Sequence, residues 1–438
     1  MRLLLFGLLI AFAPAALAQP DNLAGSWDGA ISIGAVTLDI TVTFGDATPP
    51  AATIDIPQQG AMGLPLQNVT IDLPAVRFEL QAGPGLAVFE GTRDGDIIAG
   101  AFTQSPASGT FSVTWQDPAS APPEASAEPE ASFETEPLPP GVLAETVTVD
   151  TPTGTLHGTL TWPAEAAQPV PGVVLVSGSG PTDRDGNSIM LPGKNNSLRL
   201  LAEALTAEGF AVVRFDKRGV AASAESSIAE VDLRVETFAE DVATWGRWLR
   251  ADARTTDALA LIGHSEGTLV GVLAAEDLDA DGFVALAGLG RPIQVVLRRQ
   301  LAAQLPDNVM AEADSLFATL ERGETTDALS PMLVSTFRPS VQPYLSSVMA
   351  YDPATLVADL EAPVLVVNGT TDVQVEVADG ERLAAADNAE LVVIEGMNHI
   401  LKAVTGSLTE QLPSYGDPTL TLHPDLVPAI SAFLSGIE

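Results

Sequence analysis

The sequence predicts two domains, a small all-β domain followed by a larger α/β domain built on a mostly parallel sheet. Residues 22–115 alternate apolar and polar side chains with a period of two, which is typical of half-buried strands. Beyond residue 145, short apolar runs alternate with helical segments, as in a sheet covered by helices on both faces. A chain of 438 residues with 46% hydrophobic side chains can bury both cores.

The first 18 residues have the pattern of a secretory signal peptide. Arg2 precedes an apolar stretch at residues 3–12, and the small-residue sequence Ala16-Leu17-Ala18 forms a cleavage site. The apolar run is too short for a transmembrane anchor, which needs about 20 residues. We therefore expect a secreted or periplasmic protein whose mature chain starts at Gln19.

The composition disfavours several kinds of site and partner. The chain has no cysteine, so it forms no disulfide, no thiolate metal site and no lipid anchor on cysteine. Its 57 acidic and 20 basic residues give a formal net charge of −37, which repels nucleic acid and anionic membranes. The sequence also lacks an H-E-x-x-H zinc motif. We expect no metal, no cofactor, no nucleic acid and no stable membrane anchor, and the oligomeric state is open.

The all-β domain is expected at residues 19–116. About eight strand-like runs, separated by Gly, Pro and Asp turns, predict a sandwich or a barrel. Residues 117–141 change to Pro, Ala, Glu and Ser, a composition that builds no core and is typical of an extended linker. The domain boundary is therefore predicted within this linker.

The α/β domain is expected at residues 142–438. It opens with two paired strands and continues with six buried ones. The paired strands lie near residues 145–149 and 155–162, and the buried strands near residues 173–176, 212–215, 258–262, 283–287, 364–367 and 391–394. Residues 291–360 interrupt this alternation with mainly helical sequence, which predicts a cap over the site.

One helix between the second and third buried strands has a clear apolar face. Its apolar positions are Phe238, Val242, Trp245 and Leu249. Thr237 and Glu240 have the spacing of a capping box, so the helix is expected to start at Thr237.

The sequence Gly263-His264-Ser265-Glu266-Gly267 lies between the third buried strand and a helical run at residues 268–275. This is the context of a nucleophile elbow, in which two glycines permit a tight turn that exposes the serine hydroxyl. A glycine turn without function is the alternative, and the strand before and the helix after argue against it. Ser265 is the predicted nucleophile.

A serine hydroxyl needs a general base, and a carboxylate must orient that base. His399 follows the last predicted strand and lies at the carboxyl edge of the sheet, whereas His157, His264 and His423 are placed less suitably. Asp372 follows the strand at 364–367 and is the predicted acid, with Glu376 and Asp379 as rivals. The order Ser, Asp, His is that of α/β hydrolases and differs from chymotrypsin-like and subtilisin-like enzymes.

An acyl-transfer site also needs N–H donors for an oxyanion. These are expected from the backbone of Glu266, directly after the nucleophile, and of Ser179, in the small-residue loop 176–181. The Glu266 carboxylate would repel anionic substrates or attract a cationic amine. Asp183, Arg184 and Asp185 are expected to support this loop through ion pairs, and Arg218 is interpreted in the same way.

From about Thr146 to its end, the chain resembles α/β hydrolases of the bacterial esterase and serine-aminopeptidase-like group. The matching segments are SGSGPTDRDGN at 177–187, FDKRG at 215–219, the elbow at 263–267, and GTTDVQ at 369–374 together with Asn398-His399. The sequence departs from the family at Ala221, where a glycine is usual. The run from Trp27 through Gln58-Gln59-Gly60 resembles, more loosely, the β-rich N-terminal domain of similar secreted esterases.

Three functions are consistent with these features. The first is hydrolysis of a small-molecule carboxylic ester through an acyl-enzyme on Ser265, and the second is a peptidase or amidase with the same triad. The third is a non-catalytic envelope or carbohydrate-binding protein that retains a hydrolase scaffold. A complete set of Ser265, Asp372 and His399 with an oxyanion loop argues against the third.

Overall fold

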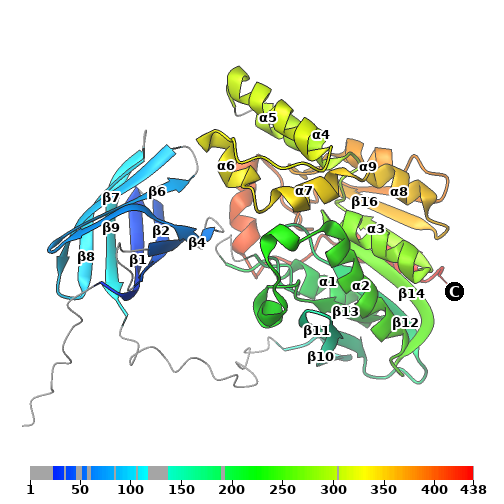
Figure 1. Cartoon of the computed structure of the whole chain (residues 1–438). Coiled ribbons are helices and arrows are strands. Elements are labelled where there is room, and N and C mark those ends of the chain that lie inside the picture. The colour runs from blue at the N-terminus through cyan, green and yellow to red at the C-terminus, as the bar shows by residue number, and fades with distance from the viewer. Residues whose placement is uncertain are drawn as a thin grey trace, which may run out of the picture. The chain divides into compact units, whose positions relative to one another are not determined.

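The structure is a computed structural model that describes residues 23–33, 36–45, 52–56, 61–82, 85–104, 107–116, 137–188, 193–302 and 305–437. The predicted signal peptide at 1–18 and residues 117–136 of the predicted linker lie outside these ranges. Two units, one around each of two sheets, are distinguished in the chain (Figure 1).

The N-terminal unit is built on strands alone. Its described residues form one nine-stranded sheet in the order β4-β3-β2-β1-β9-β8-β7-β6-β5. The strands are β1 Gly25–Ile33, β2 Val36–Phe44, β3 Ala52–Ile56, β4 Ala61–Pro65, β5 Gln67–Asp72, β6 Ala75–Ala82, β7 Gly85–Asp94, β8 Ile97–Gln104 and β9 Ala107–Trp115. Strands β1 to β4 pair in chain order, as do β5 to β9, and β9 returns beside β1, which leaves β4 and β5 at the two ends of the strand order.

The phenylalanine rings inside this sheet show that it curls around one core. Phe44 of β2 and Phe78 of β6 lie five strands apart in the sheet, which would separate them by roughly 24 Å if the sheet were flat. Their ring centroids are 5.9 Å apart instead. Phe78 also stacks on Phe89 of β7 at 4.7 Å and meets Phe111 of β9 at 5.7 Å. All four rings are buried, so they form the centre of this unit.

The second unit contains a mixed sheet of eight strands in the order β10-β11-β13-β12-β14-β15-β16-β17. β10 pairs antiparallel with β11, β11 pairs antiparallel with β13, and the remaining neighbours are parallel. The strands are β10 Val142–Thr151, β11 Gly154–Pro163, β12 Val170–Val176, β13 Ala211–Phe215, β14 Thr255–His264, β15 Gly282–Leu286, β16 Val364–Gly369 and β17 Ala389–Ile394. All eight strands predicted for this sheet are confirmed.

Helices cover both faces of this sheet. One face packs against α1 Ser197–Ala207 and α11 Leu426–Leu434. The other packs against α2 Val235–Arg250, α3 Gly267–Leu278, α8 Pro353–Asp359 and α9 Val377–Leu383. The central strands are consequently buried on both sides, and β13, β15 and β16 contain only buried residues. Shorter helical turns are η2 Ala221–Ser226, η3 Glu230–Asp232, α10 Leu408–Gln411 and η4 Leu412–Gly416.

The helix α2 starts earlier than its sequence predicts. Its N-cap is Arg234, no side chain caps it, and Thr237 lies within the first turn, so the predicted capping box is wrong. The N–H of Val235, which a capping side chain would otherwise satisfy, donates to the hydroxyl oxygen of Ser347 at 2.9 Å. A tertiary contact therefore replaces the local cap.

The connection between β15 and β16 carries helices with a small core of their own. These are α4 Ile293–Ala302, α5 Asp307–Leu320, α6 Pro331–Phe337, α7 Gln342–Met349 and the already described α8. Phe317 of α5 and Phe337 of α6 meet edge to face with centroids 5.6 Å apart, and both are buried. Ser347, which caps α2, belongs to α7, so this segment is attached to the body of the unit.

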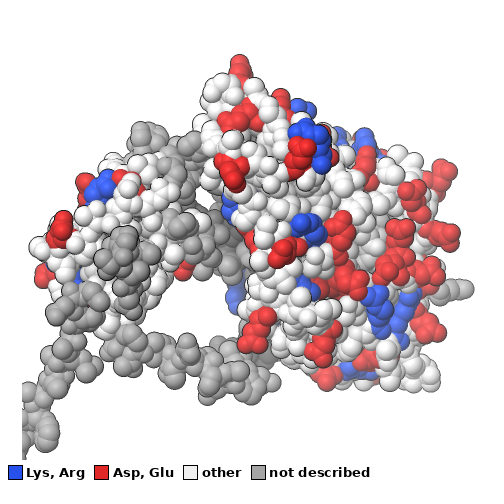
Figure 2. All heavy atoms as spheres, viewed as in Figure 1, with Lys and Arg blue, Asp and Glu red and all other residues white. Residues whose placement is uncertain are grey.

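Acidic side chains dominate the surface of the second unit. Figure 2 shows Asp and Glu spread over the visible face, with fewer Lys and Arg between them, as expected from a net charge of −37. Of the helices that the structure describes, none has the length and apolar character needed to span a bilayer.

A fragment that starts at Val142 should fold without the residues that precede it. The apolar clusters on the two faces of the eight-stranded sheet draw their residues from Val147 to Ile437, so the truncation removes none of them. We expect a single cooperative thermal transition and helical circular dichroism for residues 142–438. An insoluble fragment, or one without a cooperative transition, would contradict this prediction.

Candidate active site

The predicted elbow lies at the carboxyl edge of the eight-stranded sheet. β14 ends at His264 and α3 begins at Gly267, which leaves Ser265 on the turn between them. Ser265 has φ 56°, in the left-handed region that side chains other than glycine rarely adopt. Its N–H donates to the carbonyl oxygen of Leu286 at 2.9 Å. The conformation is thus held by the neighbouring strand β15.

The two glycines of the elbow are required by close packing. A Cβ atom at Gly263 would overlap the carbonyl oxygen of Gly267, and one at Gly267 would lie 2.5 Å from the carbonyl oxygen of Val176. Only glycine therefore lets the turn lie against itself and against the end of β12. The same packing brings the elbow next to the loop that follows β12.

Asp372 and His399 meet because their strands are neighbours. β16 and β17 pair in parallel, and each residue lies in the loop that follows its strand. His399 Nδ1 lies 2.8 Å from Asp372 Oδ2, and both side chains are buried. Asp372 Oδ1 accepts the N–H groups of Gln374 at 2.8 Å and Val375 at 2.9 Å. The carboxylate is thereby fixed in the orientation that faces the imidazole.

Each of the two rival carboxylates forms an ion pair with an arginine. Glu376 pairs with Arg299 at 2.8 Å on the surface. Asp379 is buried in α9, where it pairs with Arg291 at 2.8 Å and accepts the N–H of Gly290 at 3.2 Å. Neither contact involves His399.

The other histidines have different surroundings. His264 Nε2 lies 2.8 Å from the backbone carbonyl oxygen of His399, and the two rings are 5.0 Å apart. Burial lowers the pKa of His264 to about 4, so its neutral ring donates to that carbonyl and supports the His399 loop. His423 is buried, and its Nδ1 accepts the N–H of Asp425, the N-cap of α11. His157 lies within β11.

Ser179 and Glu266, the predicted oxyanion donors, belong to two segments that meet at Ser265. A Cβ atom at Gly178 would lie 3.1 Å from Ser265 Cβ, so the loop after β12 runs alongside the elbow. Within the described part of the chain, the N–H groups of Ser179 and Glu266 have no hydrogen-bond acceptor. Two free backbone donors next to a serine hydroxyl are the arrangement that an oxyanion requires.

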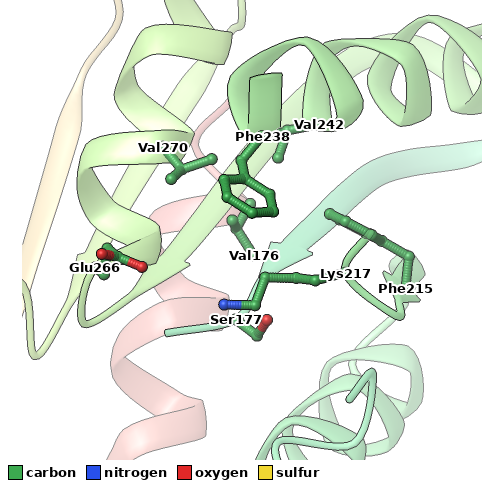
Figure 3. Close-up of a pocket in the computed structure, with 8 residues that line it drawn as sticks. All are labelled: Val176, Ser177, Phe215, Lys217, Phe238, Val242, Glu266 and Val270. Atoms are coloured by element: carbon green, nitrogen blue, oxygen red, sulfur yellow. The ribbon is translucent and has the colours of Figure 1, made fainter. Parts of the chain in front are cut away.

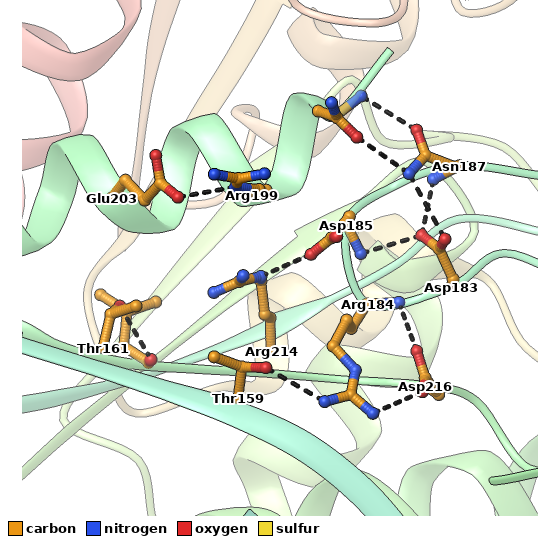
Figure 4. A network of polar contacts seen from close by, with 12 residues as sticks. Thr159, Thr161, Asp183, Arg184, Asp185, Asn187, Arg199, Glu203, Arg214 and Asp216 are labelled. Carbon is orange, nitrogen blue, oxygen red and sulfur yellow. Dashed lines mark hydrogen bonds and ion pairs between the residues drawn. The ribbon is translucent and has the colours of Figure 1, made fainter. Parts of the chain in front are cut away.

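An ion-pair network anchors the loop that carries Ser179 (Figure 4). Arg184 pairs with Asp216 at 2.6 Å, and Asp185 pairs with Arg214 at 2.8 Å. Both partners belong to β13 or follow it directly, so the predicted ion pairing of these two loop residues is confirmed. Asp183 instead accepts the N–H groups of Asp185 and Asn187, and burial raises the pKa of Asp183. Among the residues the structure describes, no group of three or more acidic or histidine side chains could hold a metal ion.

A small pocket opens beside the elbow (Figure 3). Its lining residues are Val176, Ser177, Phe215, Lys217, Phe238, Val242, Glu266 and Val270. Lys217 and Glu266 are its charged groups. Tyr344 of α7 approaches from the segment between β15 and β16, and burial together with the nearby Glu266 carboxylate raises the pKa of Tyr344. Sequence reasoning named Glu266 and quoted Lys217 only within the FDKRG segment, without a role. It missed Tyr344, which no local pattern marks.

The neutral state of His264 predicts a specific loss of stability in acid. Its pKa is about 4 in the folded chain against 6.5 for an ordinary histidine. The unfolded chain therefore binds the proton first, and the free energy of unfolding should fall by about 2 kcal/mol between pH 7 and pH 5 from this group alone. Urea denaturation of wild type and His264→Gln at both pH values measures the difference. Equal losses in the two proteins would contradict the assignment.

Part of the chain is similar to known proteins. Residues 194–402 match the family model described as serine aminopeptidase, S33. Esterase EstD of Thermotoga maritima is 27% identical over 258 residues, which cover 58% of this chain and 60% of EstD. The chain thus spans about 60% of the length of this curated relative.

Two solved structures are similar to this chain at low sequence identity. Est1E from Butyrivibrio proteoclasticus is 16% identical, with a TM-score of 0.43 and coverage of 66% of this chain and 98% of Est1E. The esterase domain of a Rhodothermus marinus protein is 18% identical, with a TM-score of 0.41 and coverage of 66% and 97%.

The fold is assigned from the topology of the eight-stranded sheet. Its strand order, with β13 and β12 exchanged relative to the chain and the elbow between β14 and α3, is that of the predicted α/β-hydrolase fold. The match of residues 194–402 to the serine aminopeptidase S33 model and this topology together give the second unit the α/β-hydrolase fold.

Proposed function

We propose that this protein is a serine hydrolase that cleaves carboxylic esters of small molecules. Ser265 is the nucleophile, His399 the general base and Asp372 the acid that orients the histidine. The observation that carries the proposal is the 2.8 Å contact between His399 Nδ1 and Asp372 Oδ2 at the sheet edge where Ser265 lies on its elbow. The curated relative named an esterase supports the same class of reaction.

The first half of the reaction forms an acyl-enzyme. Since His399 Nδ1 donates its proton to Asp372, Nε2 is left to accept the proton of the Ser265 hydroxyl. The serine oxygen bonds to the ester carbonyl carbon, and the resulting oxyanion accepts the N–H groups of Ser179 and Glu266. The carbon–oxygen bond to the alcohol then breaks, and His399 returns the proton to the leaving alcohol.

The second half releases the acid. A water molecule gives a proton to His399 Nε2 and its oxygen bonds to the acyl carbon, which again places an oxyanion on the same two N–H groups. The bond to the serine oxygen breaks, and the proton on His399 restores the Ser265 hydroxyl. The products are a carboxylic acid and an alcohol.

Amide hydrolysis is the second candidate because Glu266 places a carboxylate in the pocket beside Ser265. Such a carboxylate would attract the amine of an aminoacyl substrate. The Lys217 ammonium lines the same pocket and offsets that attraction, so we favour uncharged esters. Rates on nitrophenyl esters of increasing acyl length, compared with aminoacyl anilides, distinguish the two functions and measure the pocket.

Export through a cleaved signal peptide completes the proposal. The pattern at residues 1–18 predicts a mature N-terminus at Gln19. N-terminal sequencing of the protein recovered from the periplasm or medium of a producing bacterium should find Gln19 first. Recovery of the full-length chain from the cytoplasm would contradict export.

Replacing the nucleophile should remove the activity while leaving the fold. Ser265→Ala should abolish both ester hydrolysis and covalent labelling by a fluorophosphonate, because each requires the serine oxygen. Labelling is read by intact-protein mass spectrometry, and a thermal melt checks that the variant is folded. Labelling that persists in the variant would refute the assignment of the elbow.

Replacing the orienting acid should act on rate rather than on folding. Asp372→Asn leaves an amide that cannot stabilise the charged imidazole, so kcat should fall by about 1000-fold or more. Glu376→Gln is the matched control, since Glu376 forms an exposed ion pair in the same loop region, and should keep nearly full activity. A larger loss in the control than in Asp372→Asn would mean that the orienting acid is misassigned.

A further inference from the structure

Lys217 makes a contact that links the end of β13 to the loop carrying Ser179. The residue follows β13 by two positions, and its Nζ donates to the carbonyl oxygen of Gly178 at 2.5 Å. Figure 3 shows the Lys217 side chain reaching across the floor of the pocket, toward Ser177. The contact lies immediately beside the elbow, because Gly178 is the residue that runs past Ser265.

Because of the geometry of the peptide unit, this contact also restrains the N–H of the next residue, Ser179. The carbonyl of Gly178 and the N–H of Ser179 belong to the same peptide group, and in a trans peptide they point in opposite directions. Fixing the carbonyl on one side therefore fixes the N–H on the other. The N–H so fixed is the one that has no hydrogen-bond acceptor within the described part of the chain.

Little else in the loop holds this particular peptide. Gly178 has no side chain to resist rotation, and Ser179 is exposed. The ion pairs of Arg184 and Asp185 act several residues later in the loop. The Thr182 hydroxyl donates to the carbonyl oxygen of Ser179 at 3.0 Å, which restrains the next peptide along the chain. Lys217 is thus the side chain that opposes a rotation of the peptide between Gly178 and Ser179.

Burying the Lys217 ammonium costs desolvation free energy. Burial lowers the pKa of Lys217, and the Glu266 carboxylate acts in the opposite direction. The ammonium also lies 5.8 Å from the ring centroid of Phe238, within the range of a cation–π contact. A methionine of similar shape would fill the same volume with no charge to desolvate. Packing alone gives no reason for a lysine at this position.

We propose that Lys217 is a positioning residue for the oxyanion site: by holding the Gly178 carbonyl it keeps the Ser179 N–H turned toward the substrate oxygen. The inference rests on the proposed function, since it assigns Ser179 the role of oxyanion donor. Lys217 touches no reacting atom. Its effect is exerted through the orientation of one backbone peptide.

The kinetic test replaces Lys217 with methionine. Loss of one oxyanion donor lowers kcat by about 100- to 1000-fold, so Lys217→Met should approach this loss while KM changes little. The affinity for a boronic acid that forms a tetrahedral adduct on Ser265 should fall by a comparable factor.

Two further variants distinguish a positioning role of Lys217 from an effect of its charge or its packing. Lys217→Gln keeps an N–H donor without the charge, so it should recover part of the lost kcat, whereas a purely electrostatic role predicts that it is as slow as Lys217→Met. Lys194→Met removes the same charge at an exposed position and should behave as wild type. If Lys217→Met does not fold, the kcat of Lys217→Gln is compared with that of the wild type instead.

A crystal structure of Lys217→Met tests the orientation without reference to catalysis. The Gly178 carbonyl should be rotated or found in two orientations in the variant and single in the wild type. An unchanged peptide, or unchanged kcat and boronic acid affinity, would overturn the inference while leaving Ser265 as the nucleophile. A Ser265→Ala variant that still hydrolyses esters would overturn the proposed function instead, and the crystallographic comparison would still decide the role of Lys217.

Discussion

The close contact between the elbow and the end of β12 is the constraint on which the site depends. Gly267 leaves so little space against the carbonyl of Val176 that the turn after β14 and the loop after β12 occupy fixed positions relative to each other. Ser265 then projects from a strained backbone, and the Gly178 segment runs beside it. One steric fit between neighbouring strands thus fixes the nucleophile and the oxyanion loop together.

A different set of contacts positions His399. β16 and β17 extend the same parallel sheet, and the loops that follow them are packed so tightly that a Cβ atom at Gly369 would overlap the carbonyl oxygen of Met397. Asp372 and His399 therefore meet regardless of their separation in the chain. His264 completes the connection, because it belongs to the elbow and binds the backbone of His399. The two halves of the site are joined by one neutral imidazole.

Charged residues at the end of β13 support the oxyanion loop at three places. Arg214 and Asp216 each pair with a loop residue of opposite charge, and Lys217 binds a loop carbonyl. Arg218 points away from this loop and forms a buried pair with Asp241 of α2. Charged groups in such positions are costly to desolvate and rigid once paired. The FDKRG segment therefore acts mainly through what it holds in place.

Sequence reasoning succeeded where a feature is encoded locally. The strand before Ser265, the glycines around it and the position of each polar residue after a buried strand all follow from short-range patterns. It failed where the deciding contact joins distant segments. The start of α2 depends on Ser347, more than a hundred residues away. Tyr344 was missed, and Lys217 was given no role, for the same reason.

The hydrogen bond between Val235 and Ser347 gives the protein an internal reporter. The N–H at the first position of α2 has no partner inside the helix, so its protection from solvent comes from α7 alone. Exchange of this single amide with deuterium therefore measures how often α7 leaves the body of the unit. The same helix carries Tyr344 to the pocket beside Ser265. The opening frequency of the segment between β15 and β16 can thus be read at a backbone position outside the reacting groups, with no label added to the chain.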